Sequence, residues 1–102
     1  MIREQDGVWR VEGAVKVDTA HTLLQEAEAI WAADQLVLDL SGISEADSAV
    51  VAVLLSWRRR AHRLGKKIEY LNPTDSVRSL ISLYDVAELL FVPDSGLHSA
   101  ST

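Results

Sequence analysis

Few residues of this chain combine a chemically useful side chain with a favourable position, and Ser48 is the first of them. Ser48 and the preceding Asp47 come directly before an apolar segment with the pattern of a helix. The free N–H groups and the dipole at a helix start favour a bound or covalent phosphate. Ser48 is therefore a candidate phosphorylation site, and ordinary capping of the helix by Asp47 or Ser48 is the competing interpretation.

An enzymatic role for Ser48 needs a general base beside it, and the sequence does not place one there. His62 lies on the same predicted helix, about 21 Å away at ~1.5 Å per residue, which is too far for a catalytic hydrogen bond. His21 stays possible, but no nucleophile-elbow motif accompanies Ser48. Asp39 has no acidic neighbours at its strand end, and the chain has no cysteine. We therefore predict no enzyme, no cofactor and no metal site.

Hydrophobic periodicity predicts alternating strands and helices that would position these residues. The expected strands cover residues 9–17, with a bulge or bend at Gly13, then 36–40 and 68–71. The expected helices cover residues 20–31, capped by Asp18 or Thr19, then 48–64, closed by Gly65, and 75–84 after the turn at 72–75. Residues 41–47 are expected to form a polar loop around Gly42, and residues 86–92 a short helix or an edge strand.

This order predicts one α/β domain over residues 1–92, with a small, mostly parallel or mixed sheet and helices packed against it. Residues 93–102 are expected to form a flexible tail. The longest apolar stretch is too short to span a bilayer, and the first residues of the sequence lack the apolar core of a signal peptide. We therefore expect a soluble, cytoplasmic protein without direct membrane insertion.

Charge is distributed unevenly along the chain. The formal net charge is −5, yet residues 48–68 contain no acidic residue and six of the ten basic ones. Such a patch could contact phosphates, acidic lipid or an acidic protein surface, or it could be the solvated flank of a helix. The acidic balance of the whole chain and the lack of a recognition motif argue against nucleic-acid binding.

The first two turns of the predicted helix 48–64 are apolar nearly all round. Val50, Val53 and Leu54 belong to a stripe that can pack on the sheet, whereas Val51 and Leu55 lie to one side of it. This surplus apolar surface indicates a protein partner, unless neighbouring helices cover it.

The run Asp39–Ile43, followed by Asp47, Ser48 and an apolar helix, resembles the STAS domain, the fold of the anti-sigma factor antagonists. The resemblance covers about residues 7–92. Within this family, residues 54–61, 68–73 and 80–90 look like the MlaB branch. MlaB is the small cytoplasmic STAS subunit of a Gram-negative inner-membrane ABC transporter that moves phospholipid to maintain outer-membrane lipid asymmetry.

The resemblance implies a non-catalytic subunit that binds the transporter's ATPase subunit, MlaF, and through it the permease, at the inner membrane. The rival is an anti-sigma factor antagonist, in which a partner kinase phosphorylates Ser48 and the added charge releases the complex. Trp57 and the run Leu83–Leu90 favour the transporter branch. Both branches share one fold, so fold alone does not decide between them.

By position, Ser48 matches the Ser or Thr on which partner binding depends in the STAS family, and Asp47 would cap the helix. Ala49 and Val50 stand where Gly or Ser is common, and this bulkier opening should hinder a kinase more than a docked partner. The expected partner-binding surface centres on Ser48, and Thr74 and Arg78 of the next helix could join it. Its other predicted members are Asp47, Ala49, Val51, Ala52 and Leu55.

Overall fold

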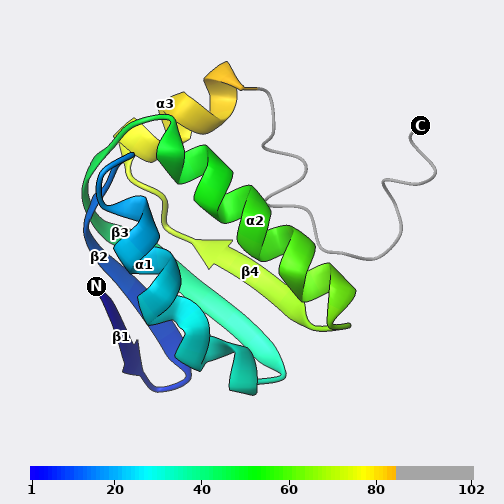
Figure 1. Cartoon of the computed structure of the whole chain (residues 1–102). Helices are drawn as coiled ribbons and strands as arrows, with labels where there is room; N and C mark the ends of the chain where they lie inside the picture. The colour runs from blue at the N-terminus through cyan, green and yellow to red at the C-terminus, as the bar shows by residue number, and fades with distance from the viewer. Residues whose placement is uncertain (85–102) are drawn as a thin grey trace.

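The computed structural model describes residues 1–84, which form a four-stranded sheet with helices packed on it (Figure 1). The order is β1 (Ile2–Gln5), β2 (Val8–Val15), α1 (Ala20–Glu26), the 3-10 helix η1 (Ala27–Ala32), β3 (Gln35–Ala46), α2 (Ala49–Arg63), β4 (Lys67–Leu71) and α3 (Asp75–Leu83). Figure 1 shows α1 and α2 on the same face of the sheet. The predicted single α/β domain is confirmed. The expected element at residues 86–92, the domain end at residue 92 and the tail at 93–102 lie outside the described residues.

The sheet is mixed, with strand order β1-β2-β3-β4. Strands β2, β3 and β4 pair in parallel, and β1 pairs antiparallel with β2. Sequence analysis missed β1, although its signal was present: Asp6 and Gly7 both have positive φ, at 53° and 82°. An Asp-Gly pair in this conformation is typical of a two-residue hairpin turn, which joins β1 to β2.

The predicted polar loop at residues 41–47 is wrong, because β3 continues through Ala46. Its pairing with β2 shifts register between Arg10 and Glu12 and again between Gly13 and Ala14, so extra β3 residues fit within the ladder. An irregularity therefore falls beside Gly13, where a bulge or bend was expected, but the extra residue lies in β3 and not in β2. Gly42 marks a close approach of two backbones: an added Cβ would lie 2.7 Å from the Val11 carbonyl oxygen.

Two further details of the first half differ from expectation. The helix predicted over residues 20–31 is α-helical only to Glu26 and then tightens into η1. Val17, the last residue of the first expected strand, follows the end of β2 and is 79% exposed. Thr19 is the N-cap residue of α1, but its side chain does not cap the helix. Its hydroxyl accepts a hydrogen bond from Lys16 N and donates one to Ala14 O.

The core lies between the sheet and the helices and has no buried charged or polar residue within residues 1–84. The predicted stripe of Val50, Val53 and Leu54 on α2 is buried, as expected. Leu64 follows the helix as its C-cap and is exposed. Gly65, with φ 68°, ends that helix as expected. The fully buried large side chains are Ile30, Leu36, Leu38, Leu40, Leu54, Ile81, Val11, Val15, Val50 and Val77.

Candidate partner-binding site

Ser48 is the N-cap residue of α2, yet its side chain does not cap the helix. Its backbone already has helical dihedrals, φ −57° and ψ −19°, and its hydroxyl makes no capping hydrogen bond. The Ser48 carbonyl oxygen accepts from Val51 N at 3.2 Å, so the backbone is part of the first turn. The side chain is exposed. The structure thus leaves the Ser48 hydroxyl at the surface, at the positive end of the helix dipole.

Asp47 performs the capping, as predicted. Its Oδ1 accepts a hydrogen bond from Ala49 N at 2.8 Å, and its backbone carbonyl oxygen accepts from Val50 N at 3.0 Å. Its other carboxylate oxygen, Oδ2, accepts from Val17 N at 3.1 Å, while Asp47 N donates to Val15 O at 3.3 Å. One side chain therefore caps α2 and fixes the loop that follows β2 beside the helix opening.

Replacing Asp47 with Ala should lower the free energy of unfolding by about 1–2 kcal/mol, since this is the usual effect of losing an N-cap acceptor. Asp47→Asn keeps one carbonyl oxygen as an acceptor, so its loss of stability should be smaller. Urea unfolding at pH 7 checks both values. An Ala variant as stable as the wild type would contradict the capping role.

The apolar opening of α2 is divided between core and surface. Val51 is only 5% exposed and belongs to the core, so internal packing accounts for this residue. Ala52 is exposed, and Ala49 and Leu55 are half-buried. The accessible part of the predicted surface therefore consists of small side chains around Ser48 with Leu55 at its edge, and a partner can approach the helix backbone closely.

The start of α3 contributes less directly than its position suggested. Thr74 is the N-cap of α3, and its hydroxyl accepts from Val77 N at 3.3 Å. Arg78 is exposed on the same helix. Helices α2 and α3 contact each other, and Figure 1 shows α3 beside the end of α2 at which that helix begins. Arg78 is thus free to join a surface centred on Ser48, whereas the Thr74 hydroxyl is already engaged.

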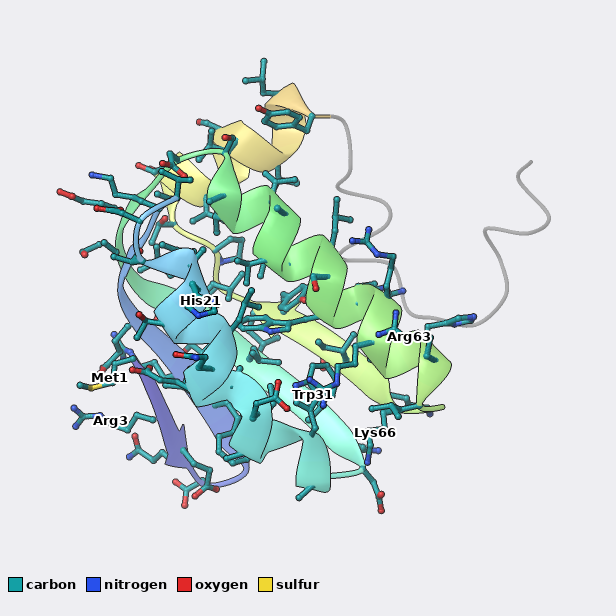
Figure 2. All side chains as sticks on the ribbon, viewed as in Figure 1. Met1, Arg3, His21, Trp31, Arg63 and Lys66 are labelled. Atoms are coloured by element: carbon teal, nitrogen blue, oxygen red, sulfur yellow. The ribbon has the colours of Figure 1, made fainter. Side chains whose placement is uncertain are left out.

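Two of the basic residues near the other end of α2, Arg60 and Lys66, make contacts that stabilise the fold. The Arg60 guanidinium donates to both carboxylate oxygens of Glu28, at 2.8 and 3.2 Å, and lies 4.5 Å from the centre of the Trp31 ring. Lys66 Nζ donates to Ala33 O at 2.8 Å. Figure 2 shows Arg63 and Lys66 where α2 gives way to β4. These contacts favour the helix-flank interpretation of the basic patch.

Asp39 has a structural role within β3, where it pairs with Arg10 of β2 and Leu71 of β4. Partial burial raises the pKa of its carboxyl, but hydrogen bonds from the Ser41 backbone and side chain and from Asn72, with the Arg10 charge, outweigh this and lower the pKa. The ionised carboxyl therefore stabilises the fold above the pKa of the unfolded chain, about 3.9. That contribution is lost as the pH falls through the lowered pKa of the folded protein.

We therefore expect Asp39→Asn to reduce stability at pH 7 and to flatten the loss of stability below about pH 4. Urea unfolding of both proteins at pH 7 and pH 3 gives this difference. If the Asn variant lost as much stability on acidification as the wild type, Asp39 would not be the group responsible.

Other candidate chemistry does not assemble. His21 and His62 are both exposed, and no group of three or more His, Asp or Glu residues within residues 1–84 could hold a metal ion. None of the helices in this part of the chain has the length and apolar character needed to cross a bilayer.

A family model described as MlaB, STAS domain, matches residues 2–93. The chain belongs to the MlaB-type STAS domain family. STAS domains are generally non-enzymatic and bind protein partners such as kinases or ATPases. No curated protein matches the chain.

Solved structures of other proteins have a similar fold, among them those of anti-sigma factor antagonists. SpoIIAA, an anti-sigma factor antagonist in its unphosphorylated form, is 18% identical and aligns over 89% of this chain and 84% of its own, with a TM-score of 0.68. A Thermotoga maritima protein assigned as a candidate anti-sigma factor antagonist is 15% identical. It aligns over 99% of this chain and 91% of its own, with a TM-score of 0.72. Phosphorylated Bacillus SpoIIAA is 15% identical and aligns over 100% of this chain and 98% of its own, with a TM-score of 0.58. At these identities the likeness supports the STAS fold alone.

Proposed function

We propose that this chain is the non-catalytic STAS subunit of an inner-membrane ABC transporter for phospholipid. It binds the MlaF-like ATPase subunit from the cytoplasm, and through it the permease, and so supports outer-membrane lipid asymmetry. The observation that supports this most is the MlaB-type family match over residues 2–93. The proposed function needs no catalytic group in this chain, since the partner carries out ATP turnover.

The geometry of the α2 opening supports docking at Ser48. The Ser48 hydroxyl is exposed and spared from capping, because Asp47 supplies the cap. The small side chain of Ala52 next to it is exposed as well. A preformed surface of this kind binds without reordering its backbone, which lowers the entropic cost of association. Docking here would let the chain bias the conformation of the ATPase.

A second candidate function is that of an anti-sigma factor antagonist regulated by phosphorylation of Ser48. One similar structure is of an anti-sigma factor antagonist in a phosphorylated form, and the Ser48 hydroxyl is accessible. A phosphate would add about −1.5 to −2 charge directly beside the Asp47 carboxylate, enough to disrupt an apolar contact.

The two candidates predict different partners. The chain should be tagged in its native host, recovered gently from detergent-solubilised cells, and its associated proteins identified by mass spectrometry. An ABC ATPase together with its permease supports the transporter function. A soluble kinase-like partner, with phosphate on Ser48, would overturn it in favour of the antagonist.

A further inference from the structure

We propose that the docking surface extends from α2 onto the loop between β2 and α1, where Val17 is an apolar contact and Asp18 an ionic one. The occupant is the ATPase subunit, through a segment that presents an apolar side chain to Val17 and a basic side chain to Asp18. This inference rests on the proposed function, because it adds residues to the same docking site.

The exposure of Val17 is the first observation. At 79% it is the most exposed large hydrophobic side chain within residues 1–84. An exposed valine has no stabilising role in the folded monomer, since it buries almost no apolar surface. Val17 is also next to the Ser48 site, because its N–H donates to Asp47 Oδ2 at 3.1 Å. An apolar side chain thus stands in water beside the opening of α2.

The loop that carries Val17 is held in place, which is the second observation. Thr19 Oγ1 accepts from Lys16 N at 2.9 Å and donates to Ala14 O at 2.9 Å. Lys16 O accepts from Thr19 N at 3.0 Å and from Ala20 N at 2.8 Å. With the bond to Asp47, these contacts anchor the turn on both sides of Val17. A fixed apolar side chain loses little conformational entropy when a partner covers it.

Charge indicates the chemistry of the partner segment. Asp18 is exposed next to Val17, and Glu45 is exposed on β3, two residues before Asp47. Lys16 pairs with Glu45 at 3.6 Å and offsets only one of these acidic groups. Six of the ten basic residues of the chain instead lie within residues 58–67, at the other end of α2 and beyond it. A basic segment is therefore complementary to the Val17 loop, and an acidic one would be repelled.

The test measures the affinity of purified full-length variants for the purified ATPase–permease complex. Val17→Ser should weaken binding at least about tenfold, as expected for a buried apolar contact of an interface. The matched control is Leu64→Ser, an exposed apolar residue at the other end of α2, which should bind like the wild type. Both variants should keep the wild-type urea midpoint, because both side chains are exposed.

Charge reversal tests the second half of the inference. Asp18→Lys should weaken binding and reduce its dependence on salt, whereas Asp34→Lys, an exposed acidic residue before β3, should do neither. Val17→Ser and Asp18→Lys binding within about twofold of the wild type would overturn the extended surface, while the proposed function would stand. A wild-type chain that failed to bind the complex would overturn both.

Discussion

Ser48→Arg is expected to abolish binding to the ATPase subunit while leaving the fold intact. The wild-type side chain is exposed and makes no capping hydrogen bond, so its replacement removes no capping contact. An arginine would project a long, charged side chain into a surface of small residues, and it would place a positive charge at the positive end of the α2 dipole. This unfavourable interaction with the helix dipole should lower the free energy of unfolding by only about 0.3–1 kcal/mol.

The expected loss of affinity is at least about 100-fold, as for a central interface residue whose replacement prevents close packing. Affinity can be measured by calorimetry with the purified ATPase–permease complex, and the fold by circular dichroism and thermal unfolding. Binding unchanged from the wild type would contradict the assignment of Ser48 to the docking surface.

The control for this variant comes from the other end of the same helix. Arg59 and Arg63 are both exposed, and changing them to Glu should affect binding much less than Ser48→Arg does. Arg60 is unsuitable for the control, since it holds Glu28 and stacks on Trp31. A large loss from the Arg59 and Arg63 changes would place the interface on the basic end of α2.

The parts of the fold that sequence predicted well are those set by local pattern. Helix α2 was located because its buried residues recur at helical spacing and Gly65 ends it in a left-handed conformation. The extension of β3 past Leu40 has no such local signal. Ser41 and Glu45 resemble loop residues, and they remain in the strand because β2 supplies partners through two register shifts, which is a tertiary effect.

The candidate site shows the same division. That Asp47 caps α2 follows from its position before a helix, whereas its bond to Val17 N depends on a segment thirty residues earlier in the chain. Helical spacing placed Val51 beside the core stripe but could not tell whether other elements cover it, and they do. Hydrophobic periodicity extended the first strand to Val17, because nothing in the pattern marks the end of β2 at Val15.

Trp57→Ala should lower the free energy of unfolding by about 3–5 kcal/mol, the usual range for removing a large aromatic side chain from a core. Trp57 is 3% exposed and lies on the face of α2 that packs into the core. A domain of this size has a total stability of about 5–15 kcal/mol, so the variant should lose a large share of that stability. Urea unfolding at 25 °C measures the loss directly.

Trp57→Phe is the matched variant, because it keeps an aromatic ring in the core and should bind the ATPase subunit like the wild type. An Ala variant of wild-type stability that failed to bind would contradict this assignment and make Trp57 a contact residue. Trp57 is among the residues by which the sequence resembles the MlaB branch, yet its burial gives it a role in packing α2. We therefore expect discrimination between an ATPase and a kinase to depend on exposed positions such as Val17, Ser48 and Ala52, where a partner can make contact.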